Sequence, residues 1–344
     1  MSLYAMSSYQ SKEYDYQLIK EQSKTDVELS IIVPLFNEAA VVEQFHRRLT
    51  CVLDAMSTGS EIIYIDDGSS DETWRKLQLL SQNTSEQALI RLSRNFGKEA
   101  AMSAGIEAAR GSAVILIDSD LQDPPELIPD MVDMWRKGYD IINMRRRERH
   151  GESWLKKTSA AVFYRLLNRL SDIPIPGNVG DFRLLSRRVV DHINALPEKT
   201  RYMKGLFSWP GFRQKVLFFD RDPRAAGETK WNYLKLLGLA FEGITSFSIQ
   251  PLRLASWGGF LTATLAVLYA LVIVFQALTL GIAPPGYASL MVATLFLGGV
   301  QLLAIGLLGE YVGRIFIETK QRPLYLVMKK SIKPASRRLT GVAS

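Results

Sequence analysis

Two aspartates two positions apart follow an apolar run near the middle of the chain. Residues 113–117 predict a buried strand of a parallel sheet, and directly after it come Asp118, Ser119, Asp120 and Gln122. If the chain stays extended, alternation puts Asp118 and Asp120 on the same side. Carboxylate and amide oxygens suit Mg²⁺ or Mn²⁺, which commonly bridge a carboxylate to a diphosphate. The spacing therefore indicates metal-assisted nucleotide chemistry, although a capped strand-to-helix turn would produce the same spacing.

Further polar side chains follow two other predicted strands, at residues 29–34 and 61–65. Phe36 and Glu38 lie in the loop after the first of these strands, and Asp67 lies in the loop after the second. Open α/β sheets bind ligands at the carboxyl ends of their strands, so these loops are expected to lie near Asp118. Phe36 could stack on a flat ring, and the two acids could accept hydrogen bonds from a base or from hydroxyl groups. Helix capping would account for the acids equally well.

Cationic side chains follow three more predicted segments. Arg94 and Lys98 follow a strand at 88–92 and could help hold an anion near a helix start. A basic cluster that begins at Arg145 follows a strand at 139–144, and a strand at 216–219 leads to a loop with several cations. Mobile loops of this composition can close over phosphates. The sequence contains neither a glycine-rich dinucleotide fingerprint nor a P-loop.

Charge is distributed unevenly along the 344 residues. The net charge is +7, yet residues 254 to 309 include no Asp, Glu, Lys, Arg or His. Two spans are expected, at 254–280 and 288–312, since about 20 residues cross a hydrocarbon core. Two spans return the chain to the side it left, and the basic residues that follow favour the cytosol. The segments 154–169 and 231–250 predict amphipathic helices at the membrane surface.

Two remaining features concern the N-terminal part of the chain. Residues 1–26 are polar, without an apolar run, and are expected to form a loosely docked arm. Cys51, the single cysteine, lies in an apolar helical pattern and is predicted to be a small core residue. One cysteine excludes an intramolecular disulfide and fits a reducing compartment.

Four motifs in order resemble the family 2 glycosyltransferases with the GT-A fold. They are the segments 34–38, 66–69, 118–122 and 224–231. With two C-terminal spans after them, they resemble the polyprenyl-phosphate (dolichyl-phosphate) hexosyltransferases, and among these the bacterial two-span undecaprenyl-phosphate glucosyltransferases. The last motif usually reads Ser-Lys-Tyr, whereas this chain has Thr229, Lys230 and Trp231, which keep the hydroxyl group.

The resemblance implies a role for each matched position. A nucleotide-sugar site is implied for Pro34, Phe36, Glu38, Ile65, Asp67, Asp118, Ser119 and Arg145. Asp120 and Gln122 are implied as ligands of Mg²⁺ or Mn²⁺. Contacts to the acceptor phosphate are implied for Arg145, Arg224 and Lys230, with Asp181 facing the sugar or the acceptor. The implied catalytic set is Asp118, Asp120, Asp181, Arg224 and Lys230.

The implied architecture is an α/β, Rossmann-like GT-A domain with a mostly parallel sheet, joined to a C-terminal transmembrane hairpin. The expected divisions are an arm (1–28), the glycosyltransferase domain (29–230), a juxtamembrane helix (231–252), the two spans (253–317) and a basic cytoplasmic tail (318–344). The implied reaction is inverting transfer of glucose from UDP-glucose to undecaprenyl phosphate. The protein would act as a homo-oligomer in the bacterial inner membrane, with the catalytic domain and both termini in the cytoplasm and no nucleic acid partner.

Three alternatives stay open on the sequence. The donor could instead be GDP-mannose, a UDP-N-acetylhexosamine or a UDP-aminoarabinose derivative, because these motifs do not determine the sugar. A processive polysaccharide synthase usually has more spans and a Q-x-x-R-W motif, which this chain lacks. A membrane-anchored nucleotide-binding protein without catalysis is the alternative from another class.

Overall fold

The computed structural model describes residues 27–56, 58–82, 87–147, 179–199, 201, 203–220, 250–280 and 286–332. The described strands are β1 (Leu29–Leu35), β2 (Ser60–Asp66), β3 (Gln87–Leu92), β4 (Ala113–Leu116), β5 (Ile141–Arg146), β6 (Val179–Ser186), β7 (Gln214–Phe219) and β8 (Val327–Ile332). The described helices are α2 (Val42–Ala55), α3 (Thr73–Gln82), α4 (Lys98–Ala108), the 3-10 turn η1 (Pro125–Leu127), α5 (Ile128–Arg136), α7 (Arg187–Ala195), α8 (Met203–Ser208), α10 (Gln250–Leu280) and α11 (Tyr287–Thr319). Residues 1–26 of the expected N-terminal arm and the amphipathic segment 154–169 lie outside these residues, as do residues 231–249 of the expected juxtamembrane helix.

The strands form one mixed sheet in the order β7-β5-β6-β4-β1-β2-β3-β8. The pairs β1–β2, β1–β4, β2–β3 and β5–β7 are parallel, whereas β6 and β8 pair antiparallel with their neighbours. The predicted mostly parallel α/β sheet is therefore confirmed. Strand β6, which contains Asp181 and lies between β4 and β5, was not among the strands predicted from the sequence.

Helices cover both faces of the sheet, and the strand side chains alternate between two cores. On β1, Ile31 packs in the core beneath α2, α3 and α5, while Ile32 packs in the core beneath α4, α7 and α8. Helix α4 comes especially close, since a Cβ added at Gly105 would lie 2.4 Å from Cγ2 of Ile32. The C-terminal half of α4, which contains Gly105, is therefore held firmly against the sheet.

Cys51 is exposed, so its predicted core position is wrong. Helix α2 buries Val42, Phe45, Leu49 and Leu53, which recur at intervals of three and four residues. At 100° per residue, Cys51 lies about 200° around the helix from Leu49 and so faces away from the core.

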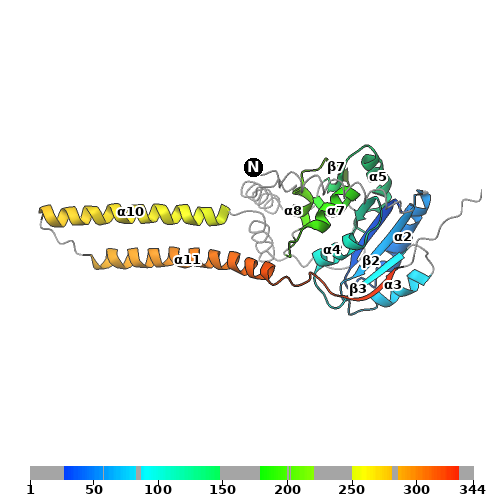
Figure 1. Cartoon of the computed structure of the whole chain (residues 1–344), viewed down its shortest axis with the longest axis horizontal. Helices are drawn as coiled ribbons and strands as arrows, with labels where there is room; N and C mark the ends of the chain where they lie inside the picture. Colours follow the sequence, from blue (N-terminus) through cyan, green and yellow to red (C-terminus); the bar gives the residue numbers. More distant parts are fainter. Residues whose placement is uncertain are drawn as a thin grey trace, which may run out of the picture.

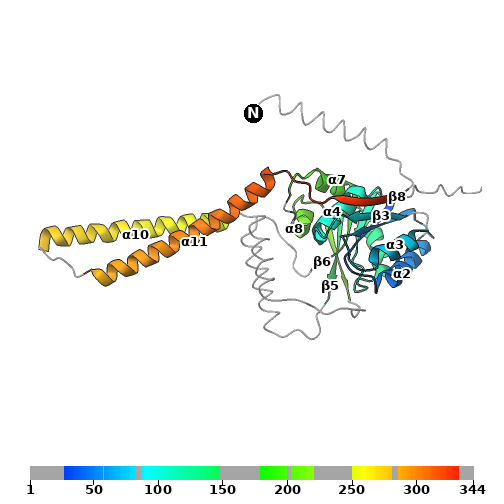
Figure 2. The ribbon, with the colours of Figure 1, turned by 90° about the horizontal axis from the view of Figure 1, so that it is seen from below.

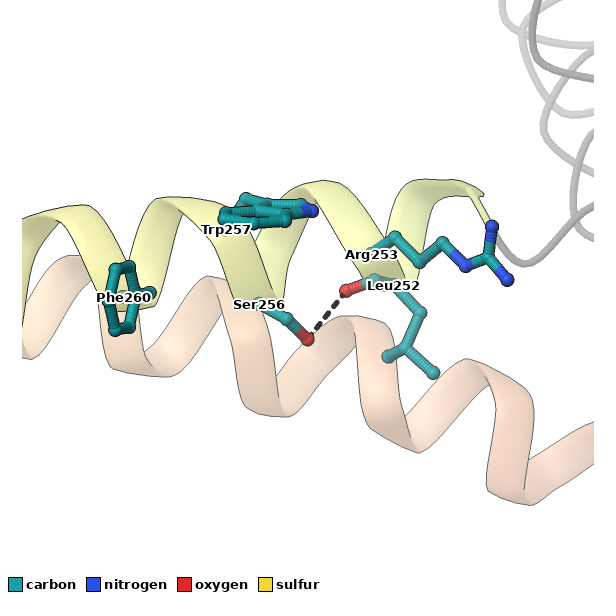
Figure 3. A pocket seen from close by; sticks show the side chains of 5 residues that line it. All are labelled: Leu252, Arg253, Ser256, Trp257 and Phe260. Carbon is teal, nitrogen blue, oxygen red and sulfur yellow. Dashed lines mark hydrogen bonds between the residues drawn. The ribbon is translucent and has the colours of Figure 1, made fainter.

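Helices α10 and α11 lie side by side and project from the sheet domain (Figures 1 and 2). They contain apolar stretches at Leu252–Ile273 and Ser289–Thr319 that are long enough to cross a membrane. Near the start of α10, Arg253, Trp257 and Phe260 surround an open pocket (Figure 3), and the two rings meet edge to face at 6.3 Å. A cation beside aromatic rings is typical of a membrane–water boundary.

After α11 the chain returns to the sheet domain instead of leaving it as a tail. Strand β8 pairs antiparallel with β3 and lies along the edge of the sheet (Figure 2). The hydroxyl of Tyr325 donates to the Glu107 carboxylate on α4, and the Lys199 N–H donates to Glu318 of α11 at 2.9 Å. Residues 318–344 were expected to form a basic cytoplasmic tail. Within this region, Val327–Ile332 instead form strand β8.

Candidate active site

Hydrogen bonds from backbone N–H groups to side-chain hydroxyls join the loop after β1 to the segment after β2. The N–H of Asn37 donates to the Ser69 hydroxyl, and the N–H of Glu38 donates to the Thr73 hydroxyl, both at 2.9 Å. Asn37 has φ 56°, a left-handed conformation that asparagine tolerates better than most residues. The Phe36 ring stays 43% exposed, so it remains available to stack on a ligand.

Two of the predicted nucleotide-site residues, Pro34 on β1 and Ile65 on β2, are less exposed than Phe36. Pro34 and Ile65 are paired across the two strands, one residue before each strand ends. Pro34 is half-buried, whereas the Ile65 side chain is fully buried in the core beneath α4. The structure therefore does not place the Ile65 side chain on the surface of the site.

Asp67 uses both carboxylate oxygens to fix the loop that precedes α4. Its Oδ1 accepts from the Phe96 N–H at 2.8 Å, and its Oδ2 accepts from the Gly97 N–H at 2.9 Å. Burial raises the pKa of Asp67 above its ordinary value, and these two hydrogen bonds act against that shift. Asp67 was expected to contribute to the nucleotide-sugar site, but its observed hydrogen bonds hold the loop just before α4 in place.

Asp67→Asn is expected to lower the free energy of unfolding by about 1–3 kcal/mol. The amide nitrogen of asparagine donates and does not accept, so one of the two backbone N–H groups would lose its partner. Thermal unfolding of the purified protein in detergent would measure the change. Asp130→Asn on the exposed side of α5 is the matched control, and equal stability of the two variants would contradict the anchoring role.

Lys98, the first residue of α4, joins two of the predicted catalytic carboxylates. Its Nζ lies 2.7 Å from Asp118 and 2.5 Å from Oδ2 of Asp181. Asp118 follows β4 and Asp181 belongs to β6, so three elements converge on one ammonium group. The Asp118 and Asp181 side chains are 28% and 19% exposed and Lys98 is 42% exposed, which leaves the cluster open to solvent. Asp118 and Asp181, which both belong to the implied catalytic set, are thus brought together in the structure.

The loop that carries Asp120 and Gln122 turns sharply. Strand β4 ends at Leu116, and Leu121 has φ 61°, which is strained for a bulky residue. Because the chain is not an extended strand through Asp120, the alternation argument does not apply there. The Gln122 N–H donates to Oδ1 of Asp120 at 3.1 Å, and the side chains of Ser119 and Gln122 are almost fully buried.

The donor set at this loop fits Mg²⁺ or Mn²⁺ only with help from a ligand. Asp120 and Gln122 offer hard oxygen atoms two positions apart. Among the described residues, no three His, Cys, Asp or Glu side chains gather as a metal site. A metal held here would complete its coordination with water and diphosphate oxygens, as Mg²⁺ does at nucleotide sites.

The basic residues at the end of β5 point in different directions. The Arg145 guanidinium lies over the Phe218 ring at 5.8 Å, whereas Arg146 lies 3.9 Å from Oδ1 of Asp123 in the loop after Gln122. The residue of this cluster that reaches the Asp120 loop is therefore Arg146, which the sequence analysis did not single out. Arg224 and Lys230 lie outside the described residues.

Two family models match this chain, one over the sheet domain and one over the hairpin. The glycosyl transferase family 2 model matches residues 30–193, and the GtrB C-terminal hairpin model matches residues 250–315. The hairpin match and the two apolar helices indicate a membrane protein. Among solved structures, the chain is similar to glucosyl-3-phosphoglycerate synthase from Mycobacterium tuberculosis, with a TM-score of 0.43 and 19% identity over 64% of this chain and 78% of that one.

The matches to relatives span almost the whole length of those relatives. An uncharacterized glycosyltransferase of Synechocystis is 52% identical over 88% of this chain and 95% of its own. A prophage bactoprenol glucosyl transferase homolog of Escherichia coli is 42% identical over 88% of this chain and 99% of its own. The bactoprenol glucosyl transferase of Shigella phage SfII is 43% identical over 88% of this chain and 98% of its own. On this similarity, which includes the C-terminal hairpin, the chain belongs to glycosyltransferase family 2.

Proposed function

We propose that the protein transfers glucose from UDP-glucose to undecaprenyl phosphate, with inversion at the anomeric carbon. The observation that carries the proposal is the similarity of 42–43% to bactoprenol glucosyl transferases over both the catalytic domain and the hairpin. Open carboxylates at the ends of β4 and β6 supply a site of suitable chemistry beside the nucleotide loops.

The acceptor phosphate is already an anion near neutral pH, so the reaction needs positioning more than deprotonation. A divalent metal at Asp120 and Gln122 would offset the charge that develops on the departing diphosphate. Asp181, which shares the Lys98 ammonium with Asp118, is a candidate proton acceptor, but a phosphate acceptor that is already ionised needs little help from a base. Arg145, Arg224 and Lys230 are proposed to hold donor or acceptor phosphates.

The proposed location is the inner membrane of a bacterium, with the catalytic domain and both termini in the cytoplasm. Lys320 and Arg322 follow α11, and Lys329 and Lys330 lie on β8, so the returning chain is basic where it leaves the hairpin. Basic flanks favour the cytoplasmic side. Self-association through the spans is also proposed, because Gly298, Gly299 and Gly306 would let helices approach closely. A mass measurement in detergent that detects monomers alone would contradict self-association.

The experiment that tests the reaction measures transfer of radiolabelled sugar to undecaprenyl phosphate. Purified protein is incubated with UDP-glucose and the lipid, with Mg²⁺, with Mn²⁺ or with a chelator. We expect an organic-extractable lipid bearing one β-linked glucose, formed only when metal is present. Product from another nucleotide sugar alone would keep the reaction type and change the donor. Polymer would indicate a processive synthase, and no product from any donor would favour a nucleotide-binding protein without catalysis.

A further inference from the structure

We propose that Lys98 is a positioning residue for glycosyl transfer, which holds the Asp118 and Asp181 carboxylates at a fixed separation across the active site. The inference deepens the proposed function and rests on it. It concerns a lysine whose observed partners are carboxylates, although the sequence favoured an anion such as phosphate.

The two carboxylates come from the same end of one strand pair. Strands β4 and β6 are antiparallel, and Leu116, the last residue of β4, is paired with Arg183. Asp118 comes two residues after Leu116 and Asp181 two residues before Arg183, so both lie at this end of the pair. Two carboxylates that share one ammonium group repel each other. The Lys98 ammonium, 2.7 Å and 2.5 Å from the two carboxylates, is the cation that offsets this repulsion.

The backbone beneath Lys98 is fixed from both sides. The Asp67 carboxylate holds the N–H groups of Phe96 and Gly97, the two residues before α4. Gly97 has φ 98°, a conformation that favours glycine, and the Glu99 carboxylate accepts from the Met203 N–H at 3.3 Å. A lysine on so constrained a first turn can determine where its partners lie, rather than follow them.

The charge state of Lys98 is consistent with this task. Partial loss of hydration would by itself lower the pKa of the Lys98 ammonium, but the charges of Asp118 and Asp181 and their hydrogen bonds raise it above its ordinary value. Lys98 therefore stays protonated at physiological pH. One ammonium between two carboxylates leaves a net negative charge, which suits a site that admits a metal with its nucleotide.

The consequence for the reaction is geometric. Asp118 adjoins Ser119 and Asp120 in the loop after β4, and Asp181 lies on the neighbouring strand β6. Transfer requires the acceptor oxygen about 3–3.5 Å from the anomeric carbon, and a misplacement of about 1 Å costs on the order of 10²-fold in rate. Without Lys98 the two carboxylates would move apart, and the two substrates would lose their alignment.

The test compares Lys98→Met and Lys98→Arg with wild type in the full-length protein in detergent, using UDP-glucose and undecaprenyl phosphate. We expect Lys98→Met to lower kcat about 10²-fold while the KM for UDP-glucose changes little, because substrate binding outside the crevice is intact. Lys98→Arg can still bridge two carboxylates and is expected to recover most of the loss. Arg136→Met is the matched control, since it breaks an ion pair to Glu28 at 2.9 Å, at the opposite end of β1.

A double variant shows whether Lys98 acts through Asp181. In Lys98→Met combined with Asp181→Asn the repulsion is gone, so we expect kcat no lower than in Asp181→Asn alone. Additive losses, or a large rise in the KM for either substrate, would show that Lys98 binds substrate directly and would overturn the positioning role. Wild-type kcat in Lys98→Met would also overturn it.

Two further measurements distinguish a loss of activity from a loss of folding. Thermal unfolding and UDP binding are measured on every variant. If Lys98→Met unfolds, Lys98→Arg and Lys98→Gln carry the comparison, and equal kcat values in these two would contradict the proposal. Absence of transfer by the wild-type protein would instead count against the proposed function.

Discussion

Asp120→Asn is expected to lower the turnover for glucosyl transfer by about 10³-fold. The substitution keeps the shape of the side chain but removes the negative charge that would bind a divalent metal. Loss of metal-assisted charge stabilisation costs several kcal/mol, and about 4 kcal/mol corresponds to on the order of 10³-fold in rate. The Gln122 N–H can still donate to the remaining carbonyl oxygen, so the turn at Leu121 should be preserved.

The measurement is the initial rate of lipid-linked glucose formation at several Mn²⁺ concentrations. Weaker metal binding should appear as a higher Mn²⁺ requirement as well as a lower maximal rate. Asp130→Asn, on the exposed side of α5, removes the same charge away from the crevice and should leave the rate unchanged. A normal rate and metal requirement in Asp120→Asn would remove Asp120 from the metal site.

The parallel half of the sheet could be predicted from the sequence, because its strands are buried on both faces. Buried strands appear as short apolar runs, such as Leu29–Leu35 and Ala113–Leu116, bounded by polar loops. Strand β6 contains Asp181 and Arg183, and β8 contains two lysines, so neither is a simple apolar run. Their places in the sheet depend on pairing with distant strands, which local pattern does not reveal.

The site was predicted as a set of loops rather than as a set of contacts. The resemblance implied that Asp118 and Asp181 both belong to the catalytic set, and in the structure they share the Lys98 ammonium. The motifs did not indicate that the Asp67 carboxylate would accept hydrogen bonds from backbone N–H groups, or that Ile65 would be buried beneath α4. Motif membership identifies the strand end on which a residue lies. The direction of its side chain depends on packing between elements far apart in the chain.

Because β8 follows the membrane hairpin in the chain, truncation before the hairpin should affect the stability of the sheet domain. Deletion of everything from residue 254 onward would remove the spans together with the strand that covers the edge of β3. It would also remove Tyr325, whose hydroxyl donates to Glu107 on α4. An uncovered edge strand invites pairing with other chains. We therefore expect this truncated protein to be less stable and more prone to aggregate than the full-length protein.

Replacement of residues 250–319 by a flexible Gly/Ser linker would separate the two effects, because β8 remains in the chain. We expect this variant to fold and to bind UDP. It should glucosylate a short, water-soluble polyprenyl phosphate at close to the full-length rate, but undecaprenyl phosphate in vesicles on the order of 10²-fold more slowly. The reason is that the anchor keeps the catalytic domain at a high effective concentration beside the lipid.

The comparison uses three proteins: the full-length chain, the linker variant and the truncated variant. Unfolding temperature and aggregation report the contribution of β8, and the ratio of rates on the long and short acceptors reports the contribution of the hairpin. Equal stability of the linker and truncated variants would show that β8 adds nothing to the sheet. An unchanged long-to-short ratio in the linker variant would show that the hairpin anchors the enzyme without presenting the lipid to it. In that case recognition of the acceptor would lie entirely within the sheet domain.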